Sequence, residues 1–541
     1  MNHQPYQQPT NRPNPNGYQQ SVPISQSSVV QPQSLHPGFT VTPKPKVTTL
    51  DTVFAWSMIP IGFLLSVAFP VVRNTLGSVL MLWVLFAFGA IYLVRSNIKI
   101  PRTSGIIAGI GAVLSLGLLF GANLVLQYLL FFAVLGLWLC FLYTACRLNG
   151  NTLTADSCFV HLIRALFVIP WASLEGIFYS LPIQKTSEKG KRVFKTVGWI
   201  FAGLGFAIFP TTIVILLLSY DSEFTALLNR IFDISWENIG TFIIDAIFGF
   251  GFAILLFGTM FGVKRRHNEK KFGKPANMNA CHVLPKALLC ATVTPILTVY
   301  VLFFISQWNY YLSAFTGHLP ENLTYANYAR NGFFELCWIV AINAVLLLLF
   351  NLLMRRREGE KRVLPKIYSS VISLFTLILI ATALSKMVLY IQSYGLTQKR
   401  VYATWLIVLL GIIFIMVLLK QFLPKMKLIF CIVAVCLLMF ALIAVPNVDG
   451  MIADYNVDEY LSGDLTEVDV ASLQSYGVSA VPALVELRDS LAEKDALTDY
   501  ENEIFTKTAY GLIITRNDLE KRPDHFFTFH IPTYRAKQLL R

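Results

Sequence analysis

Five ionisable side chains lie within or at the edge of long apolar runs, where a charge is costly; Lys286 and Lys420 can reach the inner surface, which leaves three of interest. These three are Asp245, Glu335 and Lys386. A charged residue at the centre of a membrane-spanning helix costs about 2.5–3.5 kcal/mol on insertion scales. Such groups pair with one another, line a pathway or couple ions to transport. Two interpretations stay open: a shared polar vestibule at one membrane surface, or three side chains that each reach that surface alone.

Polar and aromatic residues also gather in three stretches beside apolar runs. The middle stretch, Ser393–Tyr402, joins Lys366–Gln392 to Val401–Leu419. Each of these runs is long enough to cross a bilayer, which takes about 20 apolar residues. A turn this short keeps its side chains near the ends of both runs. We expect the other two stretches, Tyr325–Glu335 and Pro446–Asn456, to meet it at the same surface.

From these stretches we predict a polar cluster on the outer face, which either binds a ligand or is structural. Its members are Arg330, Glu335, Tyr394, Thr397, Arg400, Asn447, Asp449, Tyr455 and Asn456. Two arginines close together need compensation by carboxylates or by an anionic ligand. We therefore expect Arg400 to face Asp449 or Asp454. An internal network that pins the C-terminal part to the helices is the alternative.

No pattern of residues predicts catalysis, a metal or a cofactor. The sequence lacks a glycine-rich phosphate loop and a convincing Ser/His/Asp set. Cys281-His282 with Cys290 comes nearest to a metal site, but buried cysteines usually behave as small apolar residues. His525 and His530 are poorly spaced for a metal. We expect Asn343, in the middle of an apolar run, to make a hydrogen bond between helices rather than to bind a ligand.

Composition identifies the class of protein. Of 541 residues, 55% are hydrophobic and only 14% are charged, whereas soluble domains have about 25% charged residues. The net charge of +13 is unevenly placed, at −8 from Pro446 onward and +21 before it. Most of the positive charge lies in short loops between apolar runs, which is typical of membrane proteins and not of nucleic-acid-binding surfaces. The expected fold is an all-α polytopic transmembrane helix bundle in a lipid bilayer.

We predict about eleven membrane spans. They fall at about 53–72, 76–94, 104–122, 124–145, 197–219, 239–262, 287–306, 333–354, 367–391, 401–419 and 427–445. If the N-terminus is cytoplasmic, the inner loops hold 26 Lys and Arg residues and the outer loops five. Positive residues are retained in the cytoplasm, so this bias predicts a cytoplasmic N-terminus and an extracytoplasmic C-terminus in the cell membrane.

Two further segments are apolar, but we do not predict that they cross the membrane. Ser157–Ile183 contains Arg164, Pro170 and Glu175, so we interpret it as a helix at the inner membrane interface, with a re-entrant hairpin or a span as alternatives. Ser219–Gly240 has apolar residues at helical spacing, which predicts an amphipathic helix on the outer surface.

The chain divides into three parts. Residues 1–50 form a Gln- and Pro-rich tail that we expect to be disordered and cytoplasmic, without a cleavable signal peptide. Residues 51–445 form the bundle. Residues 446–541 form a small, acidic extracytoplasmic domain, in which Thr466 and Asp469 predict a helix start and Pro482 another. Asp499–Ile513 reads as a helix and His525–His530 as a short strand.

The polar stretches carry a resemblance to a known family. Tyr394-Gly395-Leu396-Thr397 followed by Arg400-Val401-Tyr402 resembles the signature of bacterial membrane proteins with domain of unknown function 4173, related to 4153. The rest of the resemblance lies in Tyr328-Ala329-Arg330, Gly332-Phe333-Phe334-Glu335-Leu336, Asn447, Ile452-Ala453, Tyr455-Asn456 and Ala480-Val481-Pro482-Ala483-Leu484. It covers about Leu284 to Leu487, with departures at Val448, where the family often has Pro, and at Asp454, where it has a basic residue. The resemblance implies a multi-pass bacterial membrane protein and no activity.

Three functions are compatible with the sequence. The first is a non-enzymatic scaffold or sensor of the cell envelope, with an envelope lipid or protein as the candidate partner at the outer face. The second is a secondary transporter that uses Asp245, Glu335 and Lys386. The third is a membrane enzyme that acts on a lipid-linked envelope substrate and grips phosphate with Arg330 and Arg400. We favour the first, and the sequence leaves the ligand and the oligomeric state open.

Overall fold

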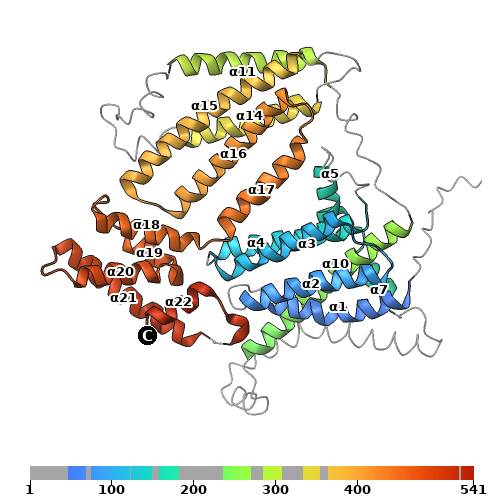
Figure 1. The fold of residues 1–541 in the computed structure, drawn as a ribbon, viewed down its shortest axis with the longest axis horizontal. Helices are drawn as coiled ribbons and strands as arrows, with labels where there is room; N and C mark the ends of the chain where they lie inside the picture. The colour runs from blue at the N-terminus through green and yellow to red at the C-terminus, as the bar shows by residue number, and fades with distance from the viewer. Residues whose placement is uncertain are drawn as a thin grey trace, which may run out of the picture. The chain divides into compact units, whose positions relative to one another are not determined.

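The computed structural model describes residues 47–68, 75–121, 123–148, 158–181, 236–269, 284–306, 333–353, 363–522 and 525–541. Helices make up nearly all of these residues, and no strand is found among them (Figure 1). The all-α class is therefore confirmed. The expected N-terminal tail up to residue 46, the span at 197–219, most of the Ser219–Gly240 segment and Arg330 lie outside the described residues. Residues Lys46–Arg541 form one compact unit.

A first group of helices packs around large buried side chains, among them Leu82, Phe131, Trp138 and Phe257. The group consists of α1 (Thr49–Ala68), α2 (Thr75–Arg95), α3 (Arg102–Ser115) with its 3-10 extension η1 (Leu116–Leu119), α4 (Leu124–Ala145) and α10 (Trp236–Asn268). At one end of the group the buried carboxylate of Asp51 pairs with Lys264 at 2.6 Å and accepts a hydrogen bond from the Tyr92 hydroxyl at 2.7 Å. This ion pair ties α1, α2 and α10 together.

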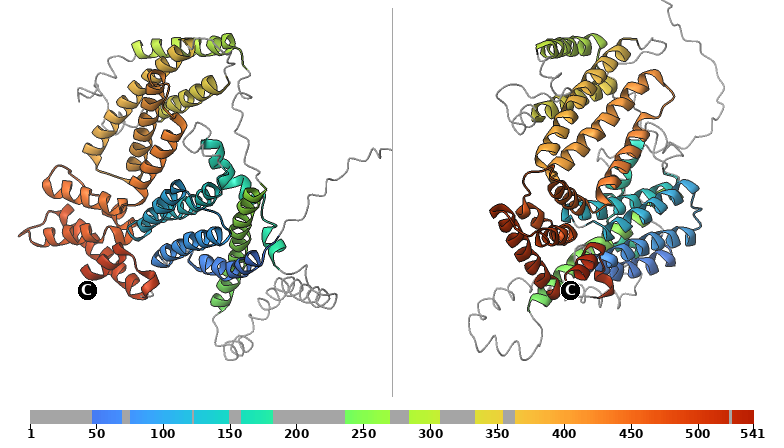
Figure 2. Two further views of the ribbon diagram at one scale, coloured as in Figure 1. Left: turned by 45° about the vertical axis from the view of Figure 1, so that its right-hand side comes forward. Right: turned by 60° about the vertical axis from the view of Figure 1, so that its left-hand side comes forward.

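A second group packs around Val340, Ile372, Leu379 and Phe414. It consists of α11 (Lys286–Ser306), α14 (Phe333–Leu353), α15 (Val363–Tyr394) and α16 (Gln398–Phe422), with α17 (Leu428–Ala444) against α16. In both further views α15 and α16 run side by side (Figure 2). Asn343 donates to the Thr376 hydroxyl at 2.9 Å, so the expected hydrogen bond between helices is confirmed.

The helices of the two groups coincide with ten of the eleven expected spans. Seven are long and apolar enough to cross a membrane, or eight if α17 and the bent helix after it count as one span. The apolar parts of α11 and α14 are shorter. A multi-pass membrane protein is therefore supported, and the number of crossings stays a prediction.

The segment after Ser157 is broken into short pieces. They are α5 (Cys158–Ile163), the π-helical turn η2 (Arg164–Val168), α6 (Ile169–Trp171) and α7 (Gly176–Ser180), of which α6 and α7 pack on α10. Pro170 lies within the break. None of these pieces is long enough to cross a bilayer as a single helix.

The helices after a 59° bend at Pro446 form a cluster within the compact unit Lys46–Arg541, and we call this cluster the C-terminal domain. Its elements are α18 (Val448–Ser462), α19 (Val470–Ser475), η5 (Gly477–Ser479), α20 (Val481–Ala492), α21 (Asp499–Lys521), η6 (Phe526–Thr528) and α22 (Ile531–Leu539). Leu484, Leu487 and Leu491 of α20 are buried together in its core.

The helix starts in this domain agree in part with the sequence signals. Pro482 lies in the first turn of α20 as expected, but α19 begins at Val470 with Asp469 as its N-cap, so Thr466 is not the cap. Thr498, which the sequence analysis did not single out, caps α21 with Glu501 in a reciprocal capping box. Helix α21 begins at Asp499 as expected but continues to Lys521. The strand expected at His525–His530 is wrong, because this stretch forms the 3-10 turn η6 and leads into α22.

The closest approach between helices tests this packing. A Cβ atom at Gly249 of α10 would lie 2.6 Å from the Phe63 Cα atom of α1, whereas one at Gly251 would meet nothing within 4 Å. We expect Gly249→Val to force α1 and α10 apart and to destabilise the protein by about 3 kcal/mol, at the upper end of overpacking costs. Thermal unfolding in detergent measures this loss of stability, with Gly251→Val as the matched control. Equal melting temperatures of the Gly249→Val and Gly251→Val proteins would contradict the close packing of α1 and α10.

Candidate functional site

The turn between α15 and α16 is closed by its own residues. Gly395 has a φ of +71°, a conformation that glycine adopts without strain. The Thr397 side chain caps α16 by accepting from the Arg400 backbone N–H. The Arg400 guanidinium donates to the carbonyls of Tyr394, at 2.7 Å, and Gly395, and it lies 4.1 Å from the centre of the Tyr390 ring. Arg400 therefore closes the C-terminal end of α15, and the expectation that it faces Asp449 or Asp454 is wrong.

Asn456 of α18 grips this turn with both ends of its amide. Its oxygen accepts from the backbone N–H of Leu396 at 2.7 Å, and its nitrogen donates to the carbonyl of the same residue at 2.8 Å. Asn456 is buried, and a Cβ atom at Gly395 would collide with its oxygen. A side chain that pairs with a backbone in this way fixes the register between the C-terminal domain and the turn.

Asp449, in the first turn of α18, connects two further helix ends. It is 4% exposed and accepts from the Gln398 side chain at 2.8 Å, and Asn123 lies at the limit of hydrogen-bond distance, 3.5 Å. Asn123 is also the N-cap of α4. Burial raises the pKa of Asp449, and the hydrogen bond from Gln398 opposes that rise. The carboxylate is thus compensated by amides rather than by an arginine.

The last helices of the chain make two more contacts with the helix ends. The Nε2 of His530 donates to the Gly121 carbonyl at 2.8 Å, and the Thr75 hydroxyl donates to the Phe529 carbonyl at 2.8 Å. Burial lowers the pKa of His530. No spacing in the sequence singled out these residues, because a lone histidine carries no signal of its partner. We call the hydrogen bonds of Asp449, Asn456, Phe529 and His530 to the helix ends the docking contacts.

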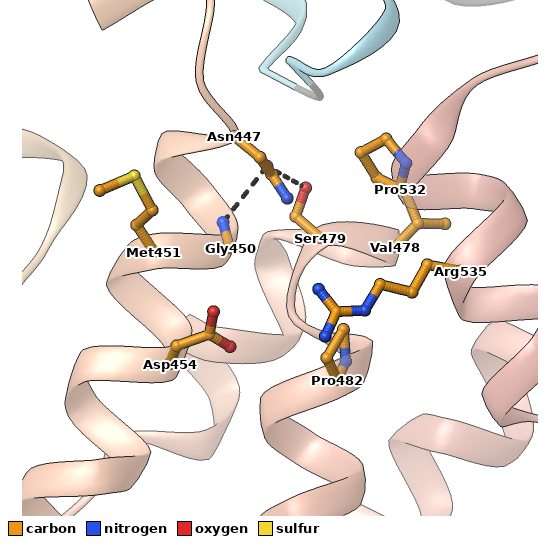
Figure 3. A pocket seen from close by; sticks show the side chains of 9 residues that line it. All are labelled: Asn447, Gly450, Met451, Asp454, Val478, Ser479, Pro482, Pro532 and Arg535. Atoms are coloured by element: carbon orange, nitrogen blue, oxygen red, sulfur yellow. Dashed lines mark hydrogen bonds between the residues drawn. The ribbon is translucent and has the colours of Figure 1, made fainter.

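Beside the docking contacts lies a cavity of about 200 Å³ within the C-terminal domain (Figure 3). Asn447 caps α18 by accepting from the Gly450 N–H at 3.3 Å, and it accepts from the Ser479 hydroxyl at 2.7 Å. Asp454 and Arg535, both exposed to solvent, also line the cavity. Partial desolvation raises the pKa of Asp454, and Arg535 opposes that rise.

Asp245, Lys386 and Tyr455 are not part of these docking contacts. Asp245 of α10 accepts from the Ser66 hydroxyl of α1 at 3.2 Å, whereas Lys386 is buried on α15 in the second helix group. Glu335 lies in the first turn of α14. Tyr455, half-buried on α18, bonds with Glu459. The shared vestibule of Asp245 and Lys386 is therefore not supported, because the two residues lie in different packing groups.

The chemistry that these residues can perform is recognition by hydrogen bonds and charge. Within the described part of the chain no three His, Cys, Asp or Glu side chains are close enough to hold a metal; Cys281 and His282 lie outside it. The polar side chains of the docking contacts are largely satisfied by backbone groups and by each other. Such a network holds two parts together, and the cavity is lined by further polar side chains, among them Asp454 and Arg535.

The amide grip on Leu396 can be measured directly. We expect Asn456→Ala to remove two hydrogen bonds, each worth about 1 kcal/mol, and so to raise amide exchange at Leu396 by about thirtyfold. Hydrogen exchange on the protein in nanodiscs reads this out. Asn502, exposed on α21, supplies the control Asn502→Ala, which should leave Leu396 unchanged. Unaltered protection in Asn456→Ala would show that the grip does not hold the turn.

Docking through His530 should depend on pH. Because burial lowers its pKa in the folded protein below the ordinary 6.5, the unfolded chain binds more protons and stability falls as pH drops below about 6.5. We expect acidification from about pH 7.5 to about pH 5.5 to lower the melting temperature more in the wild type than in His530→Gln. The difference between the two proteins isolates this histidine from Asp449 and Asp454, whose raised pKa values act in the opposite direction. Parallel curves would contradict the assignment.

Comparison with known proteins identifies the family to which the chain belongs. The model of the family described as Domain of unknown function (DUF4153) matches residues 108–487. The match ends at Leu487, as expected, but begins far upstream of Leu284; the resemblance to domain 4173 stays a prediction. No curated protein and no solved structure matches the chain. Since the match covers more than half of the sequence and includes α4, α10, the α15–α16 turn and α18, the chain belongs to the DUF4153 family.

Proposed function

We propose that this protein is a non-enzymatic scaffold or sensor of the bacterial cell envelope, with its C-terminal domain as a binding module on the extracytoplasmic face of the cell membrane. The observation that carries the proposal is the set of docking contacts. They hold the domain on three helix ends, at Thr75, Gly121 and the α15–α16 turn. A domain fixed in this way presents its free surface in a defined orientation to an envelope lipid or protein.

Charge supports the orientation. The helix ends away from the domain carry most of the basic residues of the described loops: Arg95, Lys99 and Arg102, then Arg265 and Arg266, then Lys420, Lys425 and Lys427. The domain itself is acidic, with a net charge of −8 from Pro446 onward. Positive residues stay in the cytoplasm, so we place the domain outside and the N-terminus inside.

Nothing in the described residues favours transport or catalysis to the same degree. Transport through the bundle would need charged groups along one pathway, but Asp245 lies on α10 of the first helix group and Lys386 on α15 of the second. The catalytic hypothesis used Arg330 and Arg400 to hold phosphate; Arg400 is bound to the carbonyls of Tyr394 and Gly395, and Arg330 lies outside the described residues. A binding role requires only the domain and its attachment.

Cysteine-directed labelling tests the side and the role together. In a background without native cysteines, we expect Tyr510→Cys, at an exposed position of α21, to react with a membrane-impermeant photo-crosslinker on intact cells. Lys99→Cys, exposed at the α2–α3 turn, should react only after permeabilisation. Illumination should then yield a discrete adduct of Tyr510→Cys with an envelope component.

Two results would contradict the proposal. Reaction of Lys99→Cys on intact cells would place the domain in the cytoplasm. Absence of a discrete adduct at Tyr510→Cys, and also at the exposed Glu493→Cys of the same domain, would remove the support for a binding role.

A further inference from the structure

The cavity beside the docking contacts is formed by three helical elements of the C-terminal domain. Helix α18 supplies Asn447, Gly450, Met451 and Asp454. The η5–α20 junction supplies Val478, Ser479 and Pro482, and α22 supplies Pro532 and Arg535. Figure 3 shows the charged ends of Asp454 and Arg535 turned toward the same opening, with Asn447 and Ser479 above them. Its volume of about 200 Å³ is below that of most drug-sized sites.

Asp454 and Arg535 face one another without forming an ion pair. Among the described residues of this domain, four ion pairs form: Arg488 with Asp489, Lys494 with Glu501, Lys507 with Glu503, and Arg516 with Glu520. Neither Asp454 nor Arg535 has such a partner within the described residues. A carboxylate and a guanidinium held apart across a small cavity are complementary to a molecule that carries both charges.

Asn447 adds a neutral donor to the upper part of the cavity. Its side-chain oxygen is already used by the Gly450 N–H and the Ser479 hydroxyl, which leaves the amide nitrogen as the group available for a ligand. A Cβ atom at Gly450 would collide with that nitrogen. Glycine at this position therefore keeps the donor in place above the cavity.

The geometry points to a binding site for a small zwitterion of the size of a free α-amino acid. The ligand carboxylate would accept from Arg535 and the Asn447 amide, because guanidinium groups bind carboxylates through charge-assisted hydrogen bonds. The ligand ammonium would donate to Asp454. Val478, Pro482, Pro532 and the largely exposed Met451 would contact a short apolar side chain. The inference rests on the proposed role as a binding module and gives that module a ligand class.

Calorimetry on the full-length protein in nanodiscs tests the site with L-alanine, and with acetate and methylamine as probes that carry one charge each. We expect L-alanine to bind, and each single-charge probe to bind at least about tenfold more weakly, because each lacks one charge-assisted contact. Arg535→Gln and Asp454→Asn should each weaken L-alanine binding by about tenfold or more. Arg488→Gln and Asp489→Asn, an exposed pair on α20 of the same domain, serve as matched controls and should leave it unchanged.

Three outcomes would overturn the inference. The first is no heat with L-alanine up to about 10 mM, a concentration that would reveal even a millimolar site. The second is binding that neither Arg535→Gln nor Asp454→Asn weakens. The third is acetate binding as tightly as L-alanine and insensitive to Asp454→Asn, which would show a plain anion site. An unchanged melting temperature in each variant shows that folding is preserved. The adduct at Tyr510→Cys is independent of this ligand, so failure here leaves the test of the binding module intact.

Discussion

Every backbone N–H and C=O group inside a bilayer needs a partner within the protein, because lipid tails offer none. The spans of this chain meet that requirement as helices, but a helix leaves four donors and four acceptors without partners at its ends. Most of the polar residues of the candidate site close those ends. Arg400 binds the last carbonyls of α15, Asn123 and Thr397 cap α4 and α16, and Asn456 pairs with Leu396 in the turn between two spans. The C-terminal domain is thus attached partly through backbone groups at the helix ends that need a hydrogen-bond partner whether or not the domain is present.

A different solution operates at the opposite end of the first helix group. There Asp51 is fully buried and is satisfied by Lys264, Tyr92 and the N–H and hydroxyl of Thr48. Removing one partner of a buried ion pair costs about 3–5 kcal/mol, because the other charge stays buried. The pair therefore fixes α1 and α10 at one end, while the close approach at Gly62 and Gly249 fixes them further along. Two different interactions hold the same helix pair in register.

The sequence predicted the positions of the long apolar helices well, because a run of 20 apolar residues is a local property. It also predicted the helix starts at Pro482 and Asp499, which depend on neighbouring residues only. It predicted the wrong partner for Arg400, since the arginine was matched to carboxylates in a distant segment while the carbonyls of its own turn lay five and six residues away. The partners of His530 and Lys264 were out of reach for the same reason: Gly121 and Asp51 are separated from them by hundreds of residues, and no residue pattern encodes that proximity. The strand expected at His525–His530 was wrong. An alternation over only six residues is a weak signal, and the stretch forms a 3-10 turn instead.

Helix α18 connects the docking contacts with the cavity, because one of its faces contacts the helix ends and the opposite face lines the cavity. Asp449 and Asn456 are seven residues apart, which is two helical turns, and both contact the helix ends. Asn447, Gly450, Met451 and Asp454 follow one another at spacings of three, one and three residues and line the cavity. A ligand drawn to Asp454 would therefore act on the same rigid helix whose other face grips the α15–α16 turn. Because that turn joins two spans directly, a shift of α18 would be carried into α15 and α16 without any flexible linker between the cavity and the membrane.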